Sequence, residues 1–263
     1  MIITRTPHRI SIFGGSCDYP SFYEHAGAFL IGFTIDQYVY IYVRKCLDIF
    51  DYKSRISYSK IEDVKANFDI EHPGVRGTLE YFTVKDGLSI GMCSDLPART
   101  GLGSSSSMVV GLSRAMEEYL DLAHCKKRLA NTAIEIERNV LQEPGGIQDQ
   151  IWAAYGGVNS IEIKPDGDFE VKPLPVSKEF LNALKSRIVL CHTGFSRDSF
   201  DIAASHDNQS TYDAKKKVLD IAHEGYEAFC NQDIDKIGSK LHISWLHKRA
   251  VSKKISTQTI DVA

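Results

Sequence analysis

A glycine- and serine-rich run at residues 101–107, G-L-G-S-S-S-S, holds the residues of this chain most suited to chemistry. Apolar residues recur at helical spacing directly after it, so we expect a helix to begin at its serines. The N–H groups and the dipole of a helix start form an anion site that suits nucleotide phosphates. The run lacks the lysine of a Walker A loop, and a flexible linker would rarely lead straight into a patterned helix. It therefore predicts a phosphate-binding loop of another type.

Two carboxylates follow in a second segment, E-I-E-R-N-V-L-Q-E-P-G-G-I-Q-D-Q at residues 135–150. Glu137 lies on a predicted helix, and Asp149 lies in a loop bounded by glycines. A helix glutamate near bound phosphates can hold magnesium (Mg2+), which prefers hard oxygen ligands. A loop aspartate can orient or deprotonate an attacking hydroxyl. Either carboxylate alone is more often a solvated surface group, so this segment leaves both interpretations open.

A third segment, R-T-P-H-R-I-S-I-F-G-G-S-C-D-Y-P, lies near the N-terminus at residues 5–20. It places Arg9 inside a predicted strand and Asp18 just past a glycine pair. An isolated glycine turn with incidental charges is common, so the segment alone does not separate a site from a simple strand and turn.

The elements around these segments predict an α+β fold. Early strands, central helices, a hairpin and late helices fit that class better than alternating βαβ units. The expected strands cover 2–12, 34–44, 56–59, 87–93, 158–163, 169–174 and 187–192. The expected helices cover 74–82, the stretch after the serine run, 126–141, 151–155, 212–231 and 234–251. A domain boundary is expected near 156–175.

Composition points to a small-molecule substrate in the cytoplasm. The 263 residues are 43% hydrophobic and 25% charged, with a formal net charge of -3 and no basic block that would suggest nucleic acid. The six cysteines form no C-x-x-C pair, which is typical of free thiols in a reducing compartment. The N-terminus does not resemble a signal peptide. The apolar stretch 27–43 is interrupted by Asp36 and Gln37, so it predicts buried strands and no membrane span.

The three segments together resemble the motifs of the GHMP kinase family, which includes galactokinase, homoserine kinase, mevalonate kinase and phosphomevalonate kinase. R-I-S-I-F-G-G-S-C-D-Y-P is similar to the first motif, and P-A-R-T-G-L-G-S-S-S-S is similar to the second, P-x-x-x-G-L-G-S-S-A/S. Within the family, the Q-D-Q element and H-T-G-F-S-R-D-S at 192–199 resemble the D-glycero-D-manno-heptose 7-phosphate kinases. Two departures are that Ser16 and Cys17 stand where Gly-Thr is usual, and that no glycine-rich third motif precedes Ala263.

The resemblance implies a two-domain fold and a kinase activity. A ribosomal protein S5-like N-terminal domain, 1–165, would carry the phosphate loop, and 166–263 would form a partial, truncated ferredoxin-like domain. The expected enzyme uses ATP and Mg2+ to phosphorylate the anomeric hydroxyl of a heptose 7-phosphate, giving the 1,7-bisphosphate for surface-polysaccharide synthesis. A fucokinase-type sugar 1-kinase is one alternative, and a catalytically inactive binding module without the third motif is another. The incomplete domain would expose apolar surface, which allows a homodimer.

The same resemblance assigns roles to the phosphate loop and the carboxylates. Ser105 matches the hydroxyl that contacts Mg2+, with Ser104 as a close alternative, and Glu137 completes the metal site. Asp149 would face the substrate hydroxyl, as a base or as an orienting group, and Arg9 would lie near that hydroxyl and the γ-phosphate. The residues expected to cradle the ATP phosphates are Pro97, Gly101, Leu102, Gly103, Ser104, Ser105, Ser106 and Ser107.

The sugar site is expected to involve the first motif and the later glycine loops. Arg197 is the candidate for binding the 7-phosphate, because its guanidinium fork is bidentate. A surface salt bridge from Arg197 to Asp198 or Asp201 is an equal alternative. The residues expected to bind substrate are Gly14, Gly15, Ser16, Asp18, Gly146, Gly194 and Arg197.

Overall fold

The computed structural model describes residues 1–97, 100–191, 211–251 and 256. Its strands are β1 (Ile2–Phe13), β2 (Ala28–Lys45), β3 (Ser54–Ser57), β4 (Ile61–Val64), β5 (Leu88–Ser94), β6 (Val158–Ile163) and β7 (Phe169–Pro173). Its helices are α1 (Pro20–Ala26), the short η1 (Asn67–Asp69), α2 (Pro73–Tyr81), α3 (Ser104–Tyr119), α4 (Lys126–Glu135), η2 (Ile136–Val140), α5 (Gln148–Tyr155), α6 (Lys178–Arg187), α8 (Tyr212–Cys230) and α9 (Ile234–Val251). The predicted α+β class is confirmed.

The chain forms two compact units that are interleaved along the sequence. The first contains Met1–Arg9, Thr34–Glu143 and Asp149–Gly156. The second contains Ile10–Phe33, Pro144–Gln148 and the described residues from Gly157 onward. The interleaving arises because β1 and β2 are long strands that each contribute residues to both units. The family resemblance implies two consecutive domains, 1–165 and 166–263. These interleaved units do not test that division, which stays a prediction.

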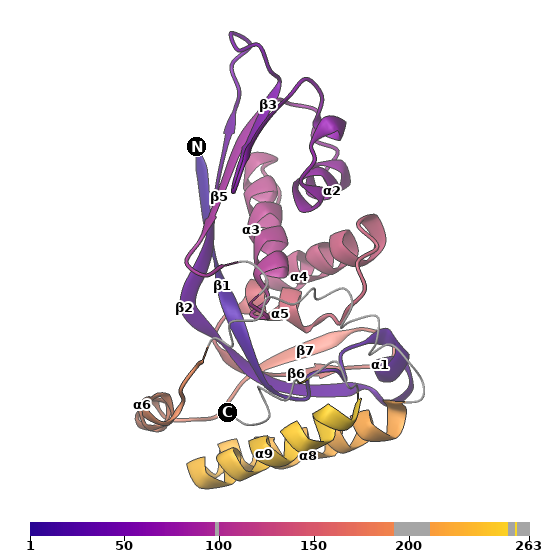
Figure 1. Cartoon of the computed structure of the whole chain (residues 1–263), viewed down its shortest axis with the longest axis vertical. Coiled ribbons are helices and arrows are strands. Elements are labelled where there is room, and N and C mark those ends of the chain that lie inside the picture. The colour runs from indigo at the N-terminus through magenta and orange to yellow at the C-terminus, as the bar shows by residue number, and fades with distance from the viewer. Residues whose placement is uncertain (98–99, 192–210, 252–255, 257–263) are drawn as a thin grey trace. The chain divides into compact units, whose positions relative to one another are not determined.

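In the first unit, helices cover one face of a mixed sheet (Figure 1). The C-terminal half of β2 pairs antiparallel with β5, from Val39 opposite Ser94 to Lys45 opposite Leu88. β3 pairs parallel with β5 and antiparallel with β4. The core joins β2 and β5 to α3 through fully buried apolar side chains, including Ile41, Ile90, Val109, Leu112 and Met116. Burial of this face fixes α3, and so the position of the loop that precedes it.

In the second unit, the N-terminal half of β2 pairs antiparallel with β6, and β6 pairs with β7. The helices α8 and α9 lie side by side in this unit (Figure 1). Its core contains Phe13, Ile31, Phe180, Ile221 and Phe229. Among the described residues, no helix combines the length and the hydropathy that a membrane span would require.

Most predicted elements are confirmed, with two informative differences. The helix predicted over 126–141 ends as α4 at Glu135, and its remainder is the wider π-helical turn η2. The strand predicted over 187–192 is wrong for 187–191, because Arg187 ends a helix and 188–191 form no strand. The helix missed there, α6, begins at Lys178 and is capped by Ser177, whose hydroxyl accepts from the Phe180 N–H at 3.1 Å. Two features of the sequence could have predicted this helix: a serine suited to the N-cap, and the apolar residues Phe180 and Leu184 at helical spacing.

Candidate active site

The glycine–serine run enters α3 through two glycines in left-handed conformations. Gly101 has φ +76° and Gly103 has φ +77°. A Cβ added at Gly103 would lie 3.3 Å from Arg9 Cγ and 3.4 Å from Asp149 Oδ2. Both the backbone angle and the close approach therefore favour glycine at 103. The predicted loop residue Pro97 is described, and it precedes residues 98–99, which lie outside the description.

The serines of the run have different surroundings at the start of α3. Ser107 Oγ donates to the Pro7 carbonyl at 2.9 Å, which ties the helix to β1. Ser105 is exposed. Ser104 Oγ is buried and has no hydrogen-bond partner in the part of the chain that the structure describes. A buried hydroxyl without a partner is costly, so its position at a helix N-terminus is consistent with a bound anion.

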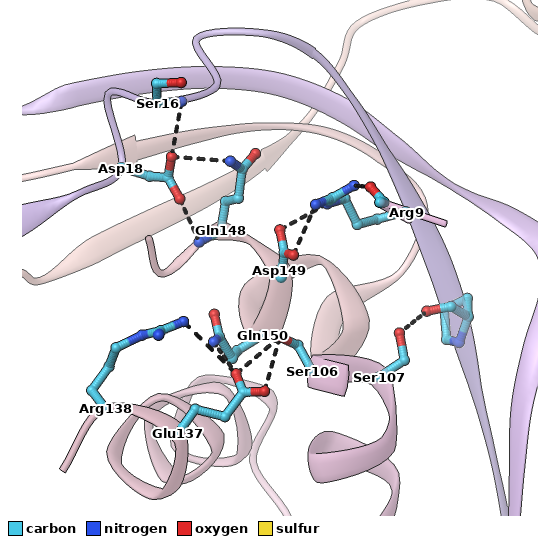
Figure 2. Close-up of polar contacts among 12 residues, drawn as sticks. Arg9, Ser16, Asp18, Ser106, Ser107, Glu137, Arg138, Gln148, Asp149 and Gln150 are labelled. Atoms are coloured by element: carbon cyan, nitrogen blue, oxygen red, sulfur yellow. Dashed lines mark hydrogen bonds and ion pairs between the residues drawn. The ribbon is translucent and has the colours of Figure 1, made fainter. Parts of the chain in front are cut away.

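Arg9 and Asp149 form a bidentate ion pair beside the loop (Figure 2). Arg9 Nε donates to Asp149 Oδ1 at 2.7 Å, and Nη2 donates to Oδ2 at 2.8 Å. The third guanidinium nitrogen, Nη1, donates to the Gly101 carbonyl at 2.8 Å, and the Arg9 N–H donates to the Leu102 carbonyl at 3.1 Å. The structure thus brings together two predicted catalytic residues from distant segments and places both against the phosphate loop.

Glu137 lies in η2 at 1% exposure and accepts hydrogen bonds from two neighbours (Figure 2). Ser106 Oγ lies 2.9 Å from Oε2, and Gln150 Nε2 donates to the same oxygen. Burial raises the pKa of Glu137 to about 7, against the opposing effects of Arg138, Gln150 and Ser106. At neutral pH this carboxyl group is therefore near its titration midpoint.

The oxygen donors around Glu137 fit a magnesium ion by chemical type. A carboxylate and a serine hydroxyl lie in hydrogen-bond contact at the start of α3, and both are hard ligands. The hydroxyl in contact with Glu137 belongs to Ser106, whereas the metal role predicted for Ser105 stays a prediction. Gln150 was not expected at this site. The only sequence signal for it was its place beside Asp149 in Q-D-Q.

In the second unit, Asp18 lies buried within the first-motif loop, residues 14–19 between β1 and α1 (Figure 2). It accepts from the Ser16 N–H at 3.2 Å, from the Gln148 N–H at 3.2 Å and from Gln148 Nε2 at 3.0 Å. A Cβ at Gly146 would lie 1.7 Å from Asp18 Oδ2, and one at Gly14 would lie 2.0 Å from the Phe29 carbonyl oxygen. These glycines therefore have a packing reason that is independent of any ligand.

The predicted substrate-binding set is only partly within the described chain. Asp18, Ser16 and Gly146 lie together, whereas Gly194 and Arg197 lie outside the described residues. Gln148, which the sequence did not single out, makes two of the hydrogen bonds to Asp18. The substrate role of the whole set stays a prediction.

Ser16 has φ +84°, a conformation that favours glycine, at a position where the related motif has glycine. We expect Ser16→Gly to be more stable than Ser16→Ala by about 1 kcal/mol, since both lose the hydroxyl and only glycine relieves the backbone. Urea unfolding of the two variants measures this difference. Equal stability, or a more stable alanine variant, would show that the loop carries no such strain.

Comparison with known proteins shows similarity to one family over part of the chain. Residues 74–157, which include the loop, Glu137 and Asp149, match the GHMP kinases N terminal domain. A D-glycero-alpha-D-manno-heptose 7-phosphate kinase from Campylobacter jejuni is 29% identical over 99% of this chain and 80% of its own length. A bifunctional fucokinase/GDP-fucose pyrophosphorylase from Arabidopsis thaliana is 23% identical over 69% of this chain, but only 18% of that protein is covered.

The fold has a close match among solved structures. A D-glycero-D-manno-heptose 1-phosphate kinase from Bacteriodes thetaiotaomicron superposes with a TM-score of 0.82 at 24% identity. The match covers 95% of this chain and 79% of that one. The fold expected from the sequence motifs is therefore confirmed.

Proposed function

We propose that this chain, whose residues 74–157 match the GHMP kinases N terminal domain, is an ATP-dependent sugar kinase whose acceptor is a heptose 7-phosphate. The observation that carries the proposal is the bidentate Arg9–Asp149 pair set against the backbone of Gly101. This pair places a cation and a carboxylate directly beside a helix N-terminus suited to phosphates. The product is the heptose 1,7-bisphosphate, a precursor for nucleotide-heptose and surface-polysaccharide synthesis in the cytoplasm.

The loop and the Arg9–Asp149 ion pair have different roles in phosphoryl transfer. The N–H groups at the start of α3 hold the ATP phosphates, and Arg9 stabilises charge on the transferred group. Asp149 orients the anomeric hydroxyl and accepts its proton. The hydroxyl oxygen bonds to the γ-phosphorus as the bond to the bridging oxygen breaks, and ADP leaves with that electron pair. Because the transition state is loose, positioning and charge stabilisation supply most of the catalysis.

Glu137 is the proposed carboxylate ligand for the Mg2+ that accompanies ATP. Ser106 and the predicted ligand Ser105 would supply hydroxyl oxygens at the same helix start. When bound, the ion neutralises phosphate charge. Gln150 holds the Glu137 carboxylate in place from α5.

The choice of acceptor rests on the relatives. The Campylobacter jejuni relative is named for a heptose 7-phosphate, and the Bacteriodes thetaiotaomicron structure is named for a heptose 1-phosphate. Both names support a phosphorylated heptose as the class. A fucokinase-type sugar 1-kinase is the second candidate, favoured by the similarity to the bifunctional fucokinase.

The direct test measures ADP release with ATP, Mg2+ and D-glycero-D-manno-heptose 7-phosphate, beside heptose 1-phosphate, fucose, galactose and mevalonate. Turnover confined to the 7-phosphate is the expected result. Turnover with fucose alone would favour the second candidate. Nucleotide and sugar binding without ADP release from any acceptor would instead identify an inactive binding module.

A further inference from the structure

Two lysine side chains from different helices lie beside the first-motif loop of the second unit. Lys215, on α8, is 1% exposed, and its Nζ lies 3.4 Å from Ser21 Oγ and 5.4 Å from the centre of the Tyr19 ring. Lys248, on α9, has its Nζ only 3.0 Å from the point where a Cβ at Gly15 would lie. Each helix thus brings one ammonium group beside this loop, and the charges of both act on the Cys17 thiol within it.

The position of Lys215 is fixed by a contact within the same unit. The Cys17 thiol is fully buried and donates to the Lys215 carbonyl at 3.3 Å. Burial raises the pKa of Cys17, so this thiol stays protonated as a donor. A lysine buried to this degree is uncommon, because removal of an ammonium group from water carries a large cost. Its burial places a positive charge beside the loop.

Polar atoms around Gly15 are also left without partners. Ser11 Oγ lies 3.3 Å from the Cβ position of Gly15, and Gln148 Nε2 lies 3.9 Å from it. Ser11 Oγ and Gln148 Oε1 are buried and have no hydrogen-bond partner among the described residues. Buried polar atoms are normally satisfied, so two such atoms around Gly15, where the Lys248 ammonium group also lies, indicate a polar ligand.

We propose that Lys215 and Lys248 bind the phosphate group that the acceptor already carries, while Asp18 and Gln148 contact its hydroxyls. The ligand class is a phosphorylated sugar, because ammonium groups suit a phosphate dianion and a carboxylate with an amide suits hydroxyls. The absence of a side chain at Gly15 leaves room for the Lys248 ammonium group. This inference rests on the proposed function and deepens it by naming the groups that select a phosphorylated acceptor.

The test is calorimetric binding by the full chain, with the unmodified protein compared with Lys215→Met and Lys248→Met. The ligands are heptose 7-phosphate, the same heptose without phosphate, and a non-hydrolysable ATP analogue. Each variant is expected to bind the sugar phosphate about 10- to 100-fold more weakly, the effect of losing one charge-assisted contact. Affinity for the unphosphorylated sugar and for the nucleotide should change by less than about threefold.

Lys216→Met is the matched control, because Lys216 is the exposed neighbour of Lys215 on α8 and the charge change is the same. It should leave all three affinities unchanged. If Lys215→Met does not fold, two other variants test whether these charges bind the phosphate. They are Lys248→Met, which removes a charge, and Lys215→Arg, which keeps it. Equal weakening for both sugars, a loss confined to the nucleotide, or an unmodified protein that does not prefer the phosphorylated sugar would each overturn the inference. A lysine-dependent preference without ADP release would uphold the inference and refute the kinase proposal.

Discussion

Replacement of Asp149 by asparagine is expected to lower kcat by ~10²–10⁴-fold, the usual contribution of a positioned general base. Asparagine is nearly isosteric, but its amide cannot accept a proton from the sugar hydroxyl. It also replaces one carboxylate oxygen opposite the Arg9 fork with an NH2 group, which breaks the bidentate pair. The measurement is steady-state ADP release over a range of acceptor concentrations.

Asp63→Asn is the control for that change. Asp63 accepts two hydrogen bonds from Arg55, both at 2.7 Å, in an exposed pair on β3 and β4. The chemistry of the substitution is the same, but an exposed pair contributes only about 0–1 kcal/mol to stability. Unchanged kcat in Asp63→Asn with the expected loss in Asp149→Asn would assign the effect to the site. A full rate in Asp149→Asn would refute its role as a base.

The split between kcat and KM separates the two roles left open for Asp149. A group that acts only in the transition state lowers kcat and kcat/KM together, whereas uniform binding raises KM alone. A group that merely orients the ground-state hydroxyl should be partly replaceable by asparagine, which still forms a hydrogen bond. A loss near the lower end of the range, with raised KM, would therefore favour orientation over proton transfer.

Local pattern was sufficient to predict the loop and the helix that follows it. The glycines at 101 and 103 need left-handed angles, and the serines with their apolar periodicity identify the start of α3. The same reasoning could not show that Arg9 and Asp149 form a pair, because they lie 140 residues apart and only the fold joins them. The family resemblance placed both near the reacting groups, but their hydrogen-bond geometry required the structure.

The sequence could not show which serine contacts Glu137, because that depends on the direction in which each helical side chain points. The helix was predicted to continue to Leu141, yet its last turn widens into η2, and the contacting hydroxyl there belongs to Ser106. A shift of one residue rotates a helical side chain by about 100°, so motif alignment alone could not choose among four consecutive serines. Lys215 and Lys248 could not be selected from the sequence for a different reason, since no local pattern distinguishes a buried lysine from a solvated one.

Glu137→Gln is expected to remove a loss of folding stability that the metal-free protein undergoes as the pH rises. The pKa of Glu137 rises from an ordinary 4.5 to about 7 because the side chain is buried. Between these values the folded state binds the proton more tightly than the unfolded state, so stability falls as the pH rises. The stability that comes from protonated Glu137 is fully present below about pH 4.5 and is lost as the pH rises through about 7. The total effect is about 3 kcal/mol.

The measurement is thermal unfolding of the metal-free protein at pH 5 and pH 8. The glutamine variant should exceed the unmodified protein in stability by less than about 1 kcal/mol at pH 5 and by about 2–3 kcal/mol at pH 8. Mg2+ with a non-hydrolysable ATP analogue should reverse the order at pH 8, because only the carboxylate gains from the cation. The same variant should lose turnover.

Glu135→Gln is the control, because Glu135 is an exposed glutamate two positions before Glu137 and its change should alter stability by less than about 0.5 kcal/mol. If Glu137→Gln gives no stability gain at pH 8, the carboxyl group is not held neutral by burial. A gain at pH 8 without loss of the Mg2+ effect would mean that another group binds the ion. The expected pattern, higher stability with lost metal response, would mean that this buried acid is retained for binding the ion, at a cost to the fold that the ion offsets.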